Sequence, residues 1–196
     1  MKGRLRNVII VTGTPGTGKT ILSRALAKAI GARYVNLTQF VSKRGLYSEI
    51  DRERRTKIVD LARTRSSLMR ELGTTNGPVV VDTHVLEGIV PGEMVRRVIV
   101  LRCHPKVLEA RLQAKKWKPD KIRENVLAEI LDSCLTAAVK QYGRRKVIQL
   151  DTSRGSVPPS VDMVRRSIVG KCSRRISVNW LARLEKEGLL DRYLRR

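Results

Sequence analysis

The chain has 196 residues, of which 41 are Lys or Arg and 18 are Asp or Glu, so its formal net charge at pH 7 is +23. At this length one domain with a full hydrophobic core is expected, and the 41% hydrophobic content is ordinary for a globular protein. The excess of positive charge favours anionic partners such as nucleotide phosphates, RNA or an acidic protein surface. It argues against the alternative that the charges are only those of a thermophilic protein, in which both signs would occur in comparable number.

The cysteines and the N-terminal stretch indicate the compartment. Cys103, Cys134 and Cys172 are far apart and in no CxxC spacing, which argues against a disulfide framework and against a zinc site. The apolar run near the N-terminus ends at Thr12 and Gly13, too early for an export signal, and no run approaches the roughly 18 apolar residues of a membrane span. We therefore expect a soluble, cytoplasmic protein that does not associate with a membrane.

Short apolar runs alternate with helical patterns along the chain. They predict five strands, at residues 8–11, 33–37, 79–81, 98–101 and 146–151. Apolar residues at helical spacing predict helices over 21–30, most of 38–77, 106–116 and about 120–142. Strands that alternate with helices favour an α/β fold in which a parallel five-stranded sheet is flanked by helices.

The stretch GTPGTGKT, residues 13–20, fits the phosphate-loop pattern G-x-x-x-x-G-K-[ST], with a buried strand before it and a helix after it. Its glycines allow several backbone N–H groups to point at phosphate oxygens, and the helix directs its positive end to the same place. Lys19 would bridge the β- and γ-phosphates, and Thr20 would offer its hydroxyl to Mg²⁺. The expected ATP contacts are Gly13, Gly16, Thr17, Gly18, Lys19, Thr20 and Ile21. The alternative is a plain glycine-rich turn.

Asp82 and His84 follow the predicted strand at 79–81, in the stretch VVVDTH. A carboxylate at the end of a buried strand is placed to hold Mg²⁺ beside Thr20, directly or through water. Mg²⁺ prefers oxygen, so His84 is not an expected ligand. We expect this histidine to orient a water molecule or the acceptor phosphate near the γ-phosphoryl group. The alternative is a hydrogen-bonded loop residue without a chemical role.

The rest of the chain indicates which kind of phosphate-loop protein this is. No base-reading motif of the NKxD type occurs, which argues against a GTPase. The size suits a small phosphotransferase whose mobile segments close over two nucleotides and exclude water. A basic stretch predicts such a lid, with a solvated basic helix end as the alternative. Its cations are Arg111, Lys115, Lys116, Lys118, Lys121 and Arg123.

Four motifs in the same order resemble those of the small adenylate kinases called isoenzyme six in eukaryotes and putative adenylate kinase in archaea. The motifs are GTPGTGKT, VVVDTH, LRCHPKVLEARL and KIRENVLAEI, and the similarity covers about residues 7–170. The resemblance implies a P-loop NTPase-type kinase domain over residues 1–170, with a monophosphate-binding segment at about 36–59 and a lid at about 114–124. Residues 171–196 would then form a basic helical extension.

The same resemblance implies a Mg²⁺-dependent nucleoside monophosphate kinase, ATP + AMP = 2 ADP, with broad specificity possible and an additional ATPase activity. It implies catalytic roles for Lys19, Asp82, His84 and Arg111, with His84 tied to ATP hydrolysis, and an ATP contact from Lys115. Family members also act in maturation of the small-subunit rRNA and contact a platform ribosomal protein. Pre-rRNA and such a protein are therefore expected partners, besides ATP and AMP.

The chain departs from the family pattern in its lid and in its acceptor segment. Lys115, Lys116 and Trp117 stand where an arginine, a glycine and an aromatic residue are usual, and lysine lacks the planar grip of arginine on phosphates. Trp117 is open to two interpretations, stacking on adenine or filling a hydrophobic gap. Gln39 and Ser42 stand where the acceptor segment usually has aspartate and arginine. The balance of kinase and ATPase activity is therefore open.

Three functions remain in competition. The first is the kinase. The second is a ribosome-assembly ATPase with little kinase activity, and the third is a basic RNA-binding protein that retains a phosphate loop. The C-terminal extension bears on this choice, because its apolar residues either pack on the kinase body or dock to rRNA or a ribosomal protein. These residues are Trp180, Leu181, Leu184, Leu189, Leu190 and Leu194, and Gly188 is predicted to separate two short helices.

Overall fold

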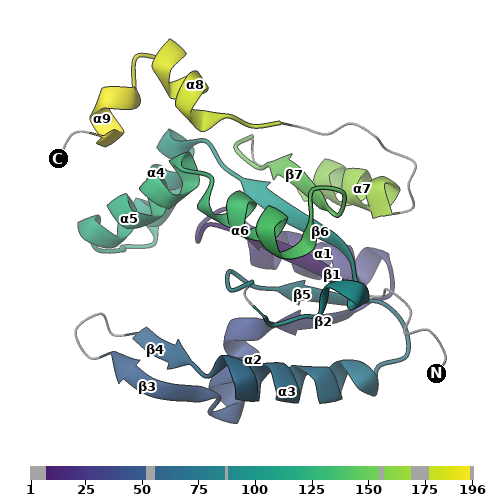
Figure 1. Cartoon of the computed structure of the whole chain (residues 1–196). Coiled ribbons are helices and arrows are strands. Elements are labelled where there is room, and N and C mark those ends of the chain that lie inside the picture. The colour runs from purple at the N-terminus through teal and green to yellow at the C-terminus, as the bar shows by residue number, and fades with distance from the viewer. Residues whose placement is uncertain (1–7, 52–55, 87, 155–156, 169–176, 195–196) are drawn as a thin grey trace.

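The computed structural model describes residues 8–51, 56–86, 88–154, 157–168 and 177–194. Its centre is a parallel sheet of five strands in the order β2-β5-β1-β6-β7 (Figure 1). The strands are β1 Val8–Gly13, β2 Arg33–Asn36, β5 Val79–Asp82, β6 Val95–Arg102 and β7 Val147–Asp151. All five strands that the sequence predicts are confirmed, and so is the α/β class.

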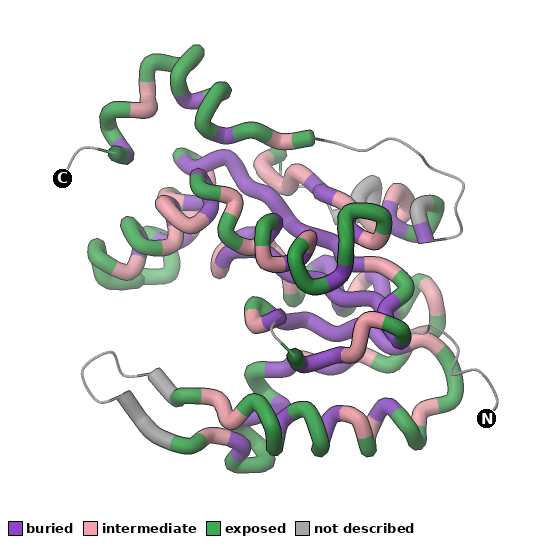
Figure 2. The backbone as a smooth tube through the Cα atoms, in the orientation of Figure 1, coloured by how far each residue is buried: buried purple, intermediate pink, exposed green. Residues whose placement is uncertain are grey.

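Helices cover both faces of the sheet because its central strands are apolar on both sides (Figure 2). Alternate residues of β1 make this plain: Ile9 and Val11 pack in the cluster that includes α1 and α7, whereas Val8 and Ile10 pack in the cluster that includes α2, α3 and α6. The helices named here are α1 Lys19–Ala29, α2 Leu37–Arg44, α3 Leu61–Gly73, α6 Ser133–Tyr142 and α7 Val157–Ile168.

The sequence predicts helix over most of the basic stretch at 38–77, and the structure differs from this prediction between two shorter helices. Between α2 and α3 the chain forms an antiparallel hairpin of β3 Tyr47–Asp51 and β4 Thr56–Val59, which does not join the main sheet. Gly45 ends α2 in the left-handed conformation at φ 62°, and Asp60 caps α3 by accepting a hydrogen bond from the Arg63 N–H. Because α2 has ended at Gly45 and α3 begins only after Asp60, the segments that form β3 and β4 can pair with each other.

The long helix expected over about 120–142 is also wrong, because two helices occupy that stretch. They are α5 Pro119–Ile130 and α6, and Asp132 separates them with a left-handed φ of 56°. Preceding α5 is α4 Pro105–Ala114, which His104 caps by accepting a hydrogen bond from the Lys106 N–H. The sequence analysis did not foresee α7, which packs beside α1.

The C-terminal segment, residues 177–194, packs on the body of the molecule next to α4 and α5 (Figure 1). It contains α8 Trp180–Lys186 and α9 Leu190–Leu194, separated by Gly188 at φ 65° as the sequence predicts. Trp180 is 1% exposed and Leu184 is fully buried. Packing on the body is therefore the arrangement observed for residues 177–194. None of the described helices is long and apolar enough to cross a bilayer.

Candidate active site

The phosphate loop lies where β1 ends and α1 begins, and its glycines are held in backbone conformations that other residues rarely adopt. Gly13, Gly16 and Gly18 have φ angles of 141°, 95° and 96°. A side chain at Gly13 would lie 2.5 Å from the Leu101 carbonyl oxygen, and one at Gly16 would lie 2.8 Å from Leu108 of α4. The loop thus needs glycine both for its curvature and for close contact with β6 and α4.

Lys19 folds back over this loop. Its Nζ donates hydrogen bonds to the carbonyl oxygens of Gly13, at 2.8 Å, and Thr14, at 3.1 Å. Burial lowers the pKa of Lys19, Lys115 lowers it further by repulsion, and the carboxylates of Asp82 and Glu129 oppose both. An ammonium group in such a setting favours a bound anion, because an anion relieves the cost of its desolvation.

Asp82, at the end of β5, is buried and lies at the meeting point of three elements. Its Oδ2 accepts hydrogen bonds from the Thr20 hydroxyl at 2.8 Å, the Asn36 amide at 2.9 Å and the Tyr34 hydroxyl at 3.0 Å. The register of the parallel strands causes this, since Asp82 pairs with Asn36 on β2 and Val11 on β1. Tyr34 and Asn36 were missed in the sequence, although they stand at alternate positions of a strand that ends beside Asp82.

The donor set at this point fits a magnesium ion. The side-chain oxygens of Thr20 and Asp82 converge within 2.8 Å, and both are hard oxygen ligands of the kind that Mg²⁺ prefers. Mg²⁺ usually takes only one or two protein ligands and completes its shell with water and phosphate oxygens. Thr20 and Asp82 are therefore the candidate protein ligands, although among the described residues no group of three His, Cys, Asp or Glu side chains could hold a metal.

His84 lies just beyond Asp82 and is exposed. Protein atoms around the ring lower its pKa by partial desolvation, repulsion from Lys19 lowers it further, and Asp82 opposes the shift. Its imidazole therefore sits within electrostatic reach of both Lys19 and Asp82 and is neutral at pH 7. A neutral imidazole at this place has a nitrogen free to accept a proton or a hydrogen bond from water. Its catalytic role stays a prediction.

The stretch predicted as a lid, about residues 114–124, covers the turn from Lys115 to Lys118 between α4 and α5, called here the lid turn, and the first half of α5. Lys115 is exposed and lies near enough to Lys19 to lower its pKa. Trp117 is 38% exposed and lines a groove of about 400 Å³ with residues of α4, α5 and α9. Arg111 points elsewhere: its guanidinium donates to the Thr152 carbonyl at 2.7 Å and to the Cys103 sulfur at 3.4 Å. Arg111 therefore joins α4 to the loop after β7, beside the phosphate loop rather than in the lid turn.

Two predicted ATP contacts differ in their surroundings. The Thr17 side chain is buried and bonds within the loop, with its hydroxyl donating to the Thr14 carbonyl at 2.8 Å. The Thr17 carbonyl accepts from the Thr152 hydroxyl at 2.9 Å and the Thr17 N–H donates to the Thr14 carbonyl at 3.2 Å, so the polar groups of Thr17 are all bonded to protein and its role as an ATP contact stays a prediction. Ile21 is 63% exposed on the first turn of α1.

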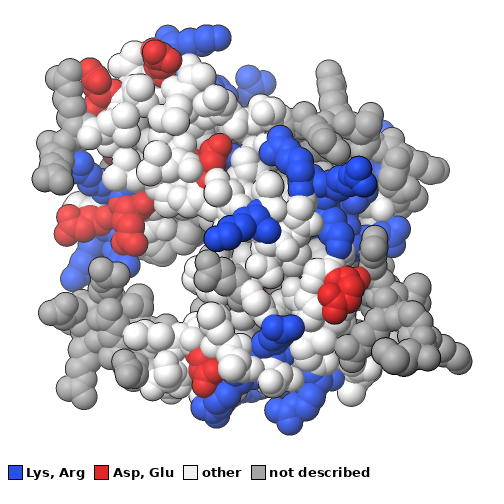
Figure 3. Space-filling model, viewed as in Figure 1, with Lys and Arg blue, Asp and Glu red and all other residues white. Residues whose placement is uncertain are grey.

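The predicted acceptor segment faces the predicted lid across the carboxyl edge of the sheet, and Figure 3 shows the molecule hollowed on this side. Gln39 and Ser42 are exposed on α2. Arg44, at the end of α2, donates to the Ser67 hydroxyl at 2.8 Å and pairs with Glu71 of α3, which also pairs with Arg33. Glu71 thus positions two arginines between β2, α2 and α3.

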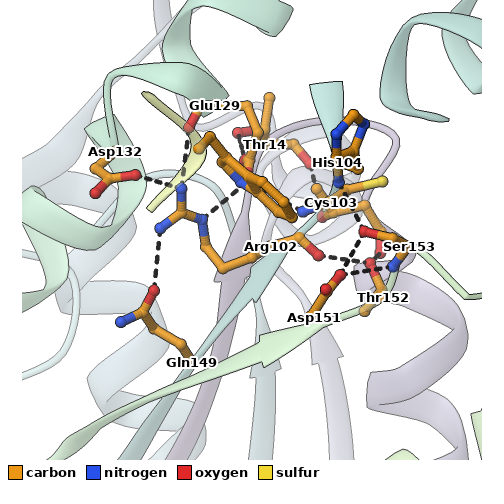
Figure 4. Close-up of polar contacts among 12 residues, drawn as sticks. Thr14, Arg102, Cys103, His104, Glu129, Asp132, Gln149, Asp151, Thr152 and Ser153 are labelled. Carbon is orange, nitrogen blue, oxygen red and sulfur yellow. Dashed lines mark hydrogen bonds and ion pairs between the residues drawn. The ribbon is translucent and has the colours of Figure 1, made fainter. Parts of the chain in front are cut away.

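A buried polar cluster that the sequence analysis missed lies behind the loop (Figure 4). Arg102, at the end of β6, is 1% exposed, and its Nε donates to Glu129 Oε1 at 2.8 Å. Arg102 also bonds Gln149 at 3.1 Å and pairs with Asp132. Glu129 Oε2 in turn accepts from the hydroxyl of Thr14, at 2.6 Å. The only sequence signal was an acid and an arginine in apolar surroundings.

Comparisons with known proteins agree with this geometry. Residues 9–132 match the family model described as AAA domain. A protein named "Putative adenylate kinase" from Methanocaldococcus jannaschii is 33% identical over 172 residues, which cover 88% of this chain and 92% of the relative. A protein of the same name from Pyrococcus abyssi is 35% identical over 174 residues, covering 88% and 91%.

Solved kinase structures share the fold. A shikimate kinase from Acinetobacter baumannii, solved with shikimate, superposes with a TM-score of 0.55 at 17% identity and covers 88% of this chain and 97% of its own. A gluconokinase from Sinorhizobium meliloti 1021 has a TM-score of 0.50 at 18% identity, with 94% and 96% covered. At these identities the likeness shows the fold alone. The archaeal relatives show more: this chain belongs to their family, whose members carry the name "Putative adenylate kinase".

Proposed function

We propose that the protein is a Mg²⁺-dependent nucleoside monophosphate kinase that transfers the γ-phosphoryl group of ATP to AMP, giving two ADP. The observation that carries the proposal is the convergence of Thr20 and Asp82 oxygens within 2.8 Å, beside the Lys19 ammonium, at the mouth of a phosphate loop. The names of the archaeal relatives support AMP as the acceptor.

Each part of the site has a task in this reaction. The backbone N–H groups of the loop and the start of α1 hold the triphosphate. Lys19 exchanges its bonds to the Gly13 and Thr14 carbonyls for bonds to phosphate oxygens and so neutralises charge on the transferring group. Thr20 and Asp82 would hold Mg²⁺, which would supply positive charge to stabilise the charge that develops on the phosphates. Catalysis of this kind depends on positioning and electrostatics, because an AMP phosphate oxygen is already a competent nucleophile.

The acceptor side supplies positive charge from a different set of residues than the usual one. Gln39 and Ser42 bear no charge, but Lys43 and Arg44 directly follow Ser42 and are exposed at the end of α2. We infer that these cations bind the monophosphate. The cations of the lid turn, Lys115 among them, would close over the triphosphate.

The test is ADP formation from Mg²⁺-ATP with and without AMP. The proposal expects an AMP-dependent excess of ADP, and Lys19→Met should abolish it. Lys28→Met, on the exposed last turn of the same helix, is the matched control and should retain activity. A wild-type protein that binds Mg²⁺-ATP but shows no acceptor-dependent ADP would overturn the kinase assignment.

ATP hydrolysis without an acceptor is the second candidate, and two observations favour it. His84 lies within electrostatic reach of Lys19 and Asp82, where a neutral imidazole would orient a water molecule. The formal charge of +23 suits a polyanion, and Figure 3 shows Lys and Arg side chains gathered over the region of α6 and β7. In this candidate the ATPase serves small-subunit assembly with pre-rRNA and a platform ribosomal protein. Phosphate release that needs no AMP and rises with small-subunit rRNA would favour it over the kinase.

A further inference from the structure

The carboxylate of Glu129 accepts hydrogen bonds from three different parts of the molecule. Its Oε1 accepts from Arg102 Nε at 2.8 Å, the Cys103 backbone N–H at 3.1 Å and the indole N–H of Trp180 at 2.8 Å. Its Oε2 accepts from the Thr14 hydroxyl at 2.6 Å. One side chain, 2% exposed, thus joins α5, β6, the phosphate loop and the C-terminal segment.

The bond to Thr14 reaches the part of the loop that Lys19 contacts. The Thr14 carbonyl accepts from Lys19 Nζ at 3.1 Å, from the Thr17 hydroxyl at 2.8 Å and from the Thr17 N–H at 3.2 Å. Thr14 itself is 1% exposed, so its side chain has no water to bond if Glu129 moves. The position of Glu129 therefore determines where the first half of the loop lies.

The bond to Trp180 reaches the C-terminal segment at its most buried point. Besides donating to Glu129, the Trp180 indole meets the His104 ring edge-on at a centroid distance of 5.3 Å. His104 Nε2 is 2.8 Å from the carboxylate of Glu187, just after α8. The buried Trp180 thus attaches the C-terminal segment to the body, together with the contact between Glu187 and His104. The indole of Trp180 bonds the same Glu129 carboxylate that bonds Thr14 of the phosphate loop.

Charge explains why the third donor matters. Arg102 and Glu129 are a buried ion pair, and a carboxylate in such a place keeps its position only while its oxygens are satisfied. The Trp180 N–H is one of three donors that hold Oε1, so without it the position of the carboxylate, and with it the bond of Oε2 to Thr14, depends on Arg102 and the Cys103 N–H alone. Glu129 in this way couples the Trp180 indole of the C-terminal segment to the Thr14 hydroxyl of the phosphate loop.

We propose that Glu129 is a positioning residue through which docking of the C-terminal segment and nucleotide binding at the phosphate loop reinforce each other. The proposal rests on the nucleotide-binding part of the proposed function, and not on which acceptor is used. Reciprocity follows from thermodynamics: if a docked segment improves ATP affinity, bound ATP strengthens docking of the segment by the same factor.

A double-mutant cycle on the full chain tests the link. Thr14→Val removes the hydroxyl and Trp180→Phe removes the indole N–H, while each keeps most of the packing. We expect the Mg²⁺-ATP Kd to rise roughly tenfold for the first and about fivefold for the second, and the double variant to be no weaker than Thr14→Val alone. Thr14→Ser, which keeps the hydroxyl, should restore affinity. Effects that multiply in the double variant would overturn the proposal.

The reciprocal measurement is hydrogen exchange in residues 177–194 with and without a non-hydrolysable ATP analogue. The wild-type segment should gain protection on binding, as should Leu181→Ala, which alters a 40% exposed side chain on the same helix. Thr14→Val should lose the gain at saturating analogue. Equal protection in Thr14→Val would overturn the coupling. A wild-type protein that binds no Mg²⁺-ATP would instead overturn the proposed function, so the two failures are distinct.

Discussion

Asp82 and Thr20 are 62 positions apart in the chain, yet a hydrogen bond of 2.8 Å joins them. The pairing of β5 with β1 places the end of one strand beside the start of the helix that follows the other. Sequence reasoning reached this pair because the phosphate-loop pattern and a strand ending in Asp each have a known place in a parallel sheet. It missed Tyr34 and Asn36, which bond the same oxygen, because a tyrosine in a strand has no distinctive pattern.

Asp82→Asn keeps the shape of the side chain and removes its charge. Because the metal supplies several kcal/mol of transition-state stabilisation, we expect ATP turnover to fall at least about 100-fold and the Mg²⁺ requirement to rise. Steady-state assays over a magnesium titration measure both. Tyr34→Phe removes one donor to Asp82 and leaves the carboxylate, so it should change turnover only slightly. Equal losses in the two variants would contradict the magnesium role.

His84→Ala should lower ATP turnover without AMP by roughly 100-fold, at the lower end of what a proton-transferring group contributes, and should leave the ATP Kd nearly unchanged. An unchanged turnover would show that His84 is only a loop residue. Steady-state kinetics measure the ATP turnover, and a separate equilibrium binding assay measures the ATP Kd.

The lowered pKa of His84 also predicts how the stability of the protein changes with pH. A histidine whose pKa in the folded protein lies below its ordinary value of 6.5 stays neutral while the unfolded chain takes up a proton. Acidification through 6.5 toward the folded pKa therefore lowers the stability that this group contributes, and pH values above 6.5 retain it. An NMR titration of the imidazole should place its pKa below 6.5, and a value above 6.5 would contradict the desolvated setting.

At the scale of elements, the strands followed from sequence and some of the helices did not. Continuous apolar runs have few alternatives to a strand buried on both faces, whereas the stretch at 38–77 mixes polar and apolar residues at both periods. The break between α5 and α6 depends on Asp132, whose left-handed conformation is stabilised by pairing with Arg102, 30 positions away. No local rule predicts an ion pair of that kind, nor the partnership of Arg102 with Glu129.

The lid turn contains a second left-handed residue, Lys116, at φ 57°. Lys116→Gly should raise the free energy of unfolding by about 0.5 kcal/mol, because relief of the left-handed strain exceeds the added entropy of the unfolded chain. Ala114→Gly is the matched control: Ala114 is an exposed residue at the end of α4, where glycine relieves no left-handed strain and helix propensity falls, so stability should drop by up to about 1 kcal/mol. Urea unfolding measures both, and a gain in the control as large as that in Lys116→Gly would contradict the assignment.

At the scale of the whole molecule, the buried cluster around Arg102 holds together parts that are distant in sequence. Arg102→Met would leave the Glu129 carboxylate buried without its cation, and the expected loss of stability is about 3–5 kcal/mol. Arg192→Met removes an ion pair to Glu109 in which the arginine is half exposed, and should cost less than about 1 kcal/mol. Comparable losses in denaturant unfolding would show that the buried cluster contributes no more than a surface pair.

The chain's two tryptophans sit in opposite surroundings. Trp180 is 1% exposed against the Glu129 carboxylate, and Trp117 is 38% exposed in the lid turn. Their ultraviolet emission therefore differs, at short wavelength for the enclosed indole and at longer wavelength for the wetted one. Trp117→Phe leaves Trp180 as the one indole that emits, so attachment of the C-terminal segment can be followed through it, without any attached dye.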